Sequence, residues 1–131
     1  MTERPYEKLK FYQDTCELRR LVVQITERFG KSHMRLVSEM RDAARSAKQN
    51  IREGYSRGSL AEFLRAIRIS QGSLEEFSGD LDDCLEDKLI SSVEYQELHR
   101  LCKSALYRST QYLKSMSESS NQGKWKTYGK V

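Results

Sequence analysis

Helix-breaking residues are almost absent from this chain, because Pro5 is the only proline among its 131 residues. Proline interrupts a helix, since it lacks the backbone N–H and clashes with the preceding turn, so the chain is free to be helical from Tyr6 to Val131. Apolar residues recur at steps of three and four, without sustained period-two alternation, and this pattern indicates helices rather than strands. It predicts four amphipathic helices, over residues 7–29, 34–54, 59–86 and 91–116.

The expected helix ends carry recognisable signals. Ser59 and Glu62 form one S-x-x-E capping box, and Ser91 and Glu94 form another. In such a box each side chain satisfies a free backbone N–H at the start of the helix. Gly54 predicts the end of the second helix, because glycine takes the left-handed conformation at low cost. Links of only a few residues force consecutive helices to pack antiparallel, so we expect an all-α, up-down-up-down four-helix bundle.

The bundle pattern ends at residue 116, which predicts one bundle domain over residues 1–116 and a flexible tail over residues 117–131. The tail combines a polar linker with the run Lys124-Trp125-Lys126. Lysines beside a stackable ring suit single-stranded nucleic acid, in which bases stack on aromatic side chains and cations follow the backbone. The ring could instead pack on its own bundle or on a neighbour, and the sequence leaves both alternatives open.

Composition argues against several classes of protein. Apolar runs never exceed three or four residues, too few for a membrane span of about 20 residues, so we expect a soluble, cytoplasmic protein. The three cysteines form no CxxC pair, and their odd number argues against a disulfide framework. The two histidines lie in separate segments, and no glycine-rich phosphate loop with its lysine is present. We therefore expect no enzyme, no cofactor, no metal site and no small-molecule substrate.

Charge is unevenly distributed, although the net charge is only +4. Residues 31–58 contain seven basic and three acidic residues, whereas residues 59–90 contain three basic and eight acidic ones. These charges either pair between neighbouring helices of one molecule or pair between copies around a ring of heterologous contacts. Gly72 and Gly79 predict close approach of another helix or subunit, since glycine inside a helix otherwise costs about 1 kcal/mol relative to alanine. The alternative is that these positions are flexible or simply tolerate glycine.

The clearest candidate site is a set of cations on the second helix. Its members, spaced four, three and four residues apart, are Arg41, Arg45, Lys48 and Arg52. This spacing places all four on one side of the helix over ~16 Å, where they can meet several backbone phosphates. Arg57, Arg65 and Arg68 are further basic candidates. The alternative is a solvated face, or one that a neighbouring subunit neutralises.

Residues 41–77 resemble the signature of a bacterial family of four-helix-bundle proteins, often encoded in intervening sequences of large-subunit ribosomal RNA genes. The shared pattern is Asn-Ile-x-Glu-Gly at 50–54, a serine at 59, Glu-Phe at 62–63 and Gly-Ser-x-x-Glu at 72–76. Arg52 stands where the family usually has alanine, and it adds a charge to the basic set. The family is related to the accessory variability proteins of diversity-generating retroelements.

This resemblance implies a homopentameric ring or barrel with a basic surface, and a partner that is nucleic acid, with RNA favoured, or a reverse transcriptase. We therefore expect a non-enzymatic, nucleic-acid-binding accessory protein that contacts RNA or DNA. The alternative is a protein-interaction scaffold, for example a partner of a reverse transcriptase, without direct nucleic-acid contact. The candidate nucleic-acid contacts are Arg41, Arg45, Lys48, Arg52, Arg57, Arg65, Arg68, Lys124, Trp125 and Lys126.

Overall fold

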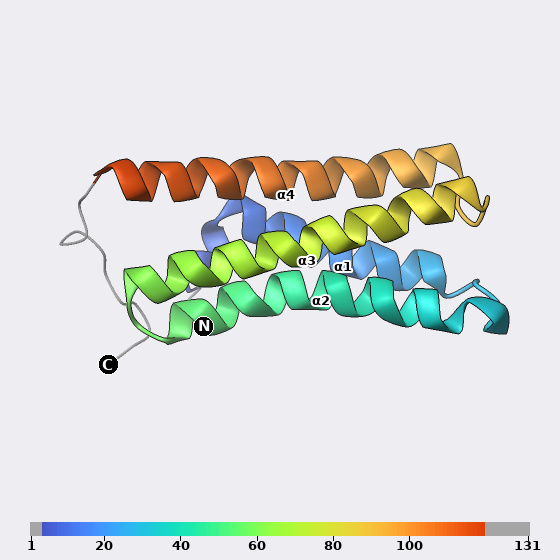
Figure 1. Ribbon diagram of the computed structural model, residues 1–131, viewed down its shortest axis with the longest axis horizontal. Helices are drawn as coiled ribbons and strands as arrows, with labels where there is room; N and C mark the ends of the chain where they lie inside the picture. Colours follow the sequence, from blue (N-terminus) through green and yellow to red (C-terminus); the bar gives the residue numbers. More distant parts are fainter. Residues whose placement is uncertain (1–3, 120–131) are drawn as a thin grey trace.

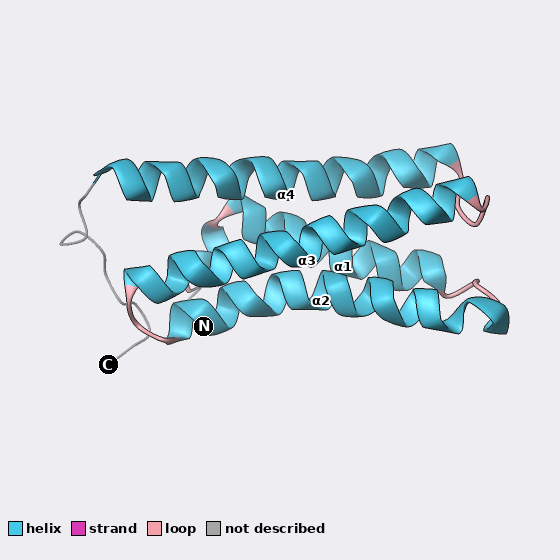
Figure 2. Cartoon of the chain, viewed as in Figure 1, coloured by secondary structure: helices cyan, strands magenta, loops and turns pink. Residues whose placement is uncertain are grey.

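The computed structural model describes residues 4–119 and contains the four long helices expected from the sequence. They are α1 (Lys10–Thr26), α2 (Met34–Ser56), α3 (Leu60–Glu86) and α4 (Ser92–Ser119), with short 3-10 helices η1 (Pro5–Lys8) and η2 (Lys31–His33). The long helices lie side by side, and short loops join consecutive helices at alternate ends (Figure 1, Figure 2). No strand occurs within residues 4–119. The prediction of an all-α four-helix bundle is confirmed.

Two helix starts show the capping chemistry predicted from the sequence. The backbone N–H of Glu62 donates to Ser59 Oγ at 3.2 Å, and α3 begins directly after this serine. At α4 the exchange is reciprocal: Glu94 N–H donates to Ser91 Oγ at 3.0 Å, and Ser91 N–H donates to Glu94 Oε1 at 2.9 Å. These bonds satisfy N–H groups that the first turn of a helix leaves without a partner.

The first and last helices differ in length from the sequence pattern. Residues 5–8 form η1 and Leu9 is extended (φ −72°, ψ 128°), so α1 begins at Lys10 rather than at residue 7. α1 also ends at Thr26, three residues before the expected limit. α4 continues to Ser119, three residues beyond the expected limit at residue 116. The apolar pattern therefore located these helices but not their ends.

Gly54 does not end α2, and that prediction is wrong. α2 continues to Ser56, and Gly54 is a buried residue within it. A Cβ at position 54 would overlap the Cβ of Ala66 and would lie 3.5 Å from the Glu62 carbonyl oxygen. Glycine is therefore required because α3 crosses α2 at this point. Gly58 instead takes the left-handed conformation (φ 85°), and its N–H donates to the Tyr55 carbonyl at 3.2 Å.

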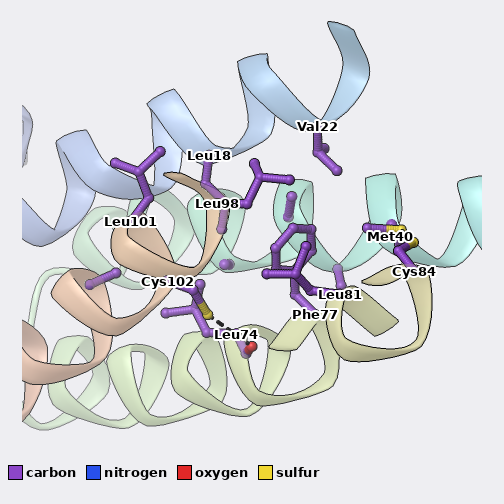
Figure 3. Close-up of a cluster of buried hydrophobic side chains, with 14 of the residues drawn as sticks. Leu18, Val22, Met40, Leu74, Phe77, Leu81, Cys84, Leu98, Leu101 and Cys102 are labelled. Carbon is purple, nitrogen blue, oxygen red and sulfur yellow. Dashed lines mark hydrogen bonds between the residues drawn. The ribbon is translucent and has the colours of Figure 1, made fainter. Parts of the chain in front are cut away.

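The hydrophobic core consists of two clusters. The first receives side chains from all four helices, and Figure 3 labels Leu18, Val22, Met40, Leu74, Phe77, Leu81, Cys84, Leu98, Leu101 and Cys102. The second is rich in aromatic residues and contains Tyr6, Phe11, Tyr12, Ile51, Tyr55, Phe63, Ile67 and Leu113. Fully burying a large apolar side chain stabilises a fold by about 1.5–3 kcal/mol. Packing of these clusters, rather than capping, therefore holds the bundle together.

All three cysteines are free thiols. Cys84 Sγ lies 3.4 Å from Met40 Sδ, and Cys102 Sγ donates to the Leu74 carbonyl at 3.3 Å (Figure 3). Burial raises the pKa of the Cys84 thiol to about 11, with the nearby carboxylates adding to the effect, and burial raises the pKa of Cys102 to about 11 as well. Both thiols stay protonated at neutral pH, as expected of core residues.

α2 and α3 pack closely because small residues line their contact. Ser70 Oγ donates to the Ala47 carbonyl at 2.6 Å, and Ser73 Oγ donates to Ser46 Oγ at 3.0 Å. Each long helix packs mainly against two others, in the order α1–α2, α2–α3, α3–α4 and α4–α1. α2 and α4 therefore lie diagonally across the bundle. None of the helices within residues 4–119 combines the length and the apolar character that a bilayer crossing needs.

Candidate nucleic-acid interface

Three cations on α2 form a line beside its buried face. Ala47 and Ile51 are buried in the core, and Arg45, Lys48 and Arg52 follow one flank of the helix at steps of three and four. Their Cα atoms span about 10 Å along the helix, at 1.5 Å per residue. None of the three forms a salt bridge with any other residue between 4 and 119. We call Arg45, Lys48 and Arg52 the basic row.

Arg41, the fourth cation of this set, has a different environment. Its side chain is half-buried, Nε donates to Thr26 Oγ1 at 2.9 Å, and Nη2 donates to the Val23 carbonyl at 3.2 Å. These bonds join α2 to the end of α1. A guanidinium has five N–H donors, so Arg41 keeps some donor capacity, but its position is fixed by the fold. Its replacement would disturb helix packing together with any surface function.

The same contacts show that the basic row faces the α1 side of α2. The charge of Arg52 is close enough to Tyr12 on α1 to oppose the effect of burial, which raises the pKa of the Tyr12 hydroxyl. Arg19 lies on the same side of α1, seven residues after Tyr12 and four before Val23, and it is exposed. The sequence interpretation missed Arg19, although its spacing from these two residues was a usable signal.

Four arginines on or next to α1 and α4 differ from the basic row because they are paired, whereas Arg19 on α1 forms no salt bridge within residues 4–119. The exposed pairs Arg20–Glu17 and Arg100–Glu97 have N···O distances of 2.6 and 2.8 Å. Two further pairs reach α4: Arg28, two residues after the end of α1, pairs with Glu94 at 2.6 Å, and Asp14 on α1 pairs with Arg108 at 3.8 Å. Their positive charges are thus partly neutralised within the molecule. The basic row has no such neighbour within the described part of the chain.

The remaining candidates do not continue the basic row. Arg57 and Arg65 line a groove of about 240 Å³ between α2 and α3, together with Glu53 and Glu62, so this groove carries both signs of charge. Arg68 is exposed on α3. The structure therefore separates these arginines from Arg45, Lys48 and Arg52. Lys124, Trp125 and Lys126 lie outside the described residues.

Carboxylates gather on the α3 side of α2. Glu39, Asp42, Glu76 and Asp80 line a groove of about 520 Å³ between α2 and α3. We call these four residues the acidic groove. Burial raises the pKa of Asp80, and the nearby Glu39, Asp83 and Glu76 raise it further. No set of three or more histidine, cysteine or carboxylate side chains within residues 4–119 is arranged to hold a metal ion.

Gly72 and Gly79 are exposed on α3, and nothing lies within 4 Å of a Cβ built at either position. No other helix of the described bundle therefore approaches their backbone. This outcome removes one of the explanations predicted from the sequence, namely packing against another helix of the described bundle. Contact with a second subunit stays a prediction, and a flexible or tolerated position is the alternative.

Comparison with known proteins identifies the family of the chain. A family model described as 23S rRNA-intervening sequence protein matches residues 7–110. A comparison with curated proteins finds no match. The matched region extends from η1 into α4, so it includes α1, α2 and α3 completely and α4 as far as residue 110. The chain therefore belongs to the 23S rRNA-intervening sequence protein family.

Proposed function

We propose that this protein is a non-enzymatic accessory protein that binds RNA or DNA through the basic row on α2. The observation that carries the proposal is the unpaired state of Arg45, Lys48 and Arg52, in contrast to the four arginines that form salt bridges, Arg20, Arg28, Arg100 and Arg108. Unpaired cations are costly to bring together because they repel one another. A polyanion relieves this repulsion and releases its own condensed counterions, which favours binding.

Helical geometry suits this row to a nucleic-acid backbone. Side chains fixed at steps of three and four along a rigid helix present their charges at regular intervals, as a nucleic-acid strand presents its phosphates. Arg45 and Arg52 can each bind a phosphate through two N–H groups, whereas Lys48 acts as a point charge. Exposed Arg19 adds a fourth cation from α1. Contacts of this kind fix position on the backbone and carry no sequence information.

The test is the combined variant Arg45→Gln, Lys48→Gln and Arg52→Gln, with binding to an RNA hairpin measured by fluorescence anisotropy. Glutamine keeps the helix and the length of the side chain but removes three charges. We expect affinity to fall about tenfold or more near 50 mM salt. The matched control is Arg20→Gln, Arg100→Gln and Arg108→Gln, which changes the net charge equally and should keep most of the affinity. Equal losses in the two variants would contradict the assignment.

Self-association is the second part of the proposal, and the resemblance suggests five subunits. Opposite flanks of α2 carry opposite charges: the basic row on the α1 side and the acidic groove on the α3 side. No salt bridge connects α2 with α3 within residues 4–119, so these charges are not used for internal pairing. Without nucleic acid, the basic flank of one copy can therefore meet the acidic groove of the next, and repetition of this contact closes a ring. The acidic groove and nucleic acid use the same row, so the two compete for it.

A protein-interaction scaffold is the alternative, and the acidic groove is the observation that favours it. Four carboxylates without a cation among the residues that line their groove suit a basic protein surface. A reverse transcriptase is the partner that the resemblance suggests. In this case the combined basic-row variant would bind RNA no more weakly than the wild type.

A further inference from the structure

Tyr107 on α4 is the most exposed aromatic side chain among residues 4–119, with 67% of its surface accessible. Other tyrosines have structural roles. Tyr6 packs edge-on against Tyr12 with 5.0 Å between ring centroids, and Tyr95 stacks on His99 and donates to Asp82 at 2.8 Å. Tyr107 makes no hydrogen bond and no ring contact with any residue in this range. Most of the side chain is therefore available to a ligand.

Two lysines lie on the same side of α4 as this ring. Lys103 precedes Tyr107 by four residues and Lys114 follows it by seven, and these steps place the three side chains on one line. Both lysines are exposed, and neither forms a salt bridge within the described part of the chain. The line is about 17 Å long at 1.5 Å per residue. A cation therefore stands on either side of a free aromatic ring.

We propose that this outer face of α4 binds single-stranded nucleic acid. An unpaired base stacks on the ring of Tyr107, while the ammonium groups of Lys103 and Lys114 contact phosphates on either side of it. Every base has a π-face, so stacking on one tyrosine gives affinity without strong sequence preference. A base inside a duplex has both faces covered by its neighbours and cannot use this ring. The site is therefore selective for unpaired segments.

This site is separate from the basic row. α2 and α4 each pack against α1 and α3 and lie diagonally across the bundle, and Figure 1 shows the two helices apart from each other. The inference goes beyond the proposed function, which rests on backbone contacts at α2. Together, the two faces would let one molecule hold a folded RNA by a helical segment at α2 and by an unpaired segment at α4.

The experiment compares Tyr107→Ala with Tyr107→Phe. Phenylalanine keeps the stacking face and alanine removes it, and neither change touches the core because the side chain is exposed. Binding of an oligouridine single strand and of a short RNA duplex is measured by fluorescence anisotropy at one salt concentration. We expect alanine to weaken single-strand binding about tenfold, the size of effect that base–aromatic stacking gives. Phenylalanine should match the wild type, and duplex binding should be unchanged in both variants.

Single-strand binding by Tyr107→Ala that equals the wild type would overturn the inference. An equal loss for single strand and duplex would also overturn it, because the effect would not depend on unpaired bases. These outcomes are distinct from failure of the proposed function. A wild-type protein that binds the duplex but no single strand refutes this inference alone, whereas a protein that binds neither refutes the basic row as well. Replacing Lys103 and Lys114 together by glutamine should reduce single-strand binding and its salt dependence.

Discussion

Replacing Gly54 by alanine should destabilise the protein, although alanine is the better helix former. The new Cβ would overlap Ala66 Cβ, at less than the 3.0 Å that real Cβ atoms maintain. Both atoms are fixed to helix backbones, so α2 and α3 must move apart along their closest contact. Overpacking of this kind costs about 1–3 kcal/mol, and the severe overlap places this case near 3 kcal/mol. The gain in helix propensity offsets about 1 kcal/mol, which leaves a net loss of about 2 kcal/mol.

Thermal unfolding followed by circular dichroism measures this effect, and a domain of this size shifts by about 4 °C per kcal/mol. We expect the midpoint of Gly54→Ala to fall by about 8 °C. Gly72→Ala is the control, because its Cβ meets nothing within 4 Å and should raise the midpoint by about 4 °C. In an Ala66→Gly background the overlapping atom is absent, so Gly54→Ala should become stabilising. A midpoint for Gly54→Ala at or above that of the wild type would refute the reasoning.

Two further predictions concern charge. The hydrogen bond from Arg28 holds the pKa of Glu94 at about 2, below the ordinary value of 4.5, and hydrogen bonds with Ser91 also lower it. The stability that this pair contributes is therefore present above pH 4.5 and is lost as the pH falls toward 2. Glu94→Gln should therefore lower the free energy of unfolding by about 1 kcal/mol at neutral pH, a value reduced because solvent screens the half-exposed charge of Arg28. Urea unfolding at several pH values measures this free energy, and the difference between variant and wild type should vanish in acid. Light scattering at micromolar concentration should give a mass well above the 15.3 kDa monomer, decreasing as salt screens the contacts; 15.3 kDa at low and moderate salt would contradict the ring.

Local signals in the sequence were sufficient to predict the four helices, because helix formation depends mainly on residues that are close together along the chain. Apolar period located all four, and the serine-glutamate boxes marked two starts. The prediction for Gly54 was wrong because glycine occurs for two different reasons. It can end a helix in the left-handed conformation, or it can allow two helices to cross closely, and the sequence alone does not distinguish the two cases. Only the position of Ala66 on another helix distinguishes them. Gly58, four residues later, is the left-handed residue.

The candidate site was also predictable only as far as local helical spacing allows. Helical spacing placed Arg45, Lys48 and Arg52 on one flank, but the sequence could not tell which helix would lie beside that flank. The different environment of Arg41 follows from the position of Thr26 on α1, which is a tertiary fact. Tyr107 was missed although it comes nine residues after Leu98, which places it on the side of the helix opposite the core, so helical spacing alone predicts its exposure.

The central claim is that the basic row binds nucleic acid, and the salt dependence of binding to a short DNA duplex tests it most directly. The logarithm of the binding constant falls with the logarithm of salt concentration by about 0.9 for each phosphate neutralised on duplex DNA. Replacing Arg45, Lys48 and Arg52 by glutamine should therefore make the slope shallower by about 2.7, while the control variant at Arg20, Arg100 and Arg108 keeps most of the wild-type slope. No detectable wild-type binding near 50 mM salt, or the same slope in the basic-row variant as in the wild type, would contradict the account.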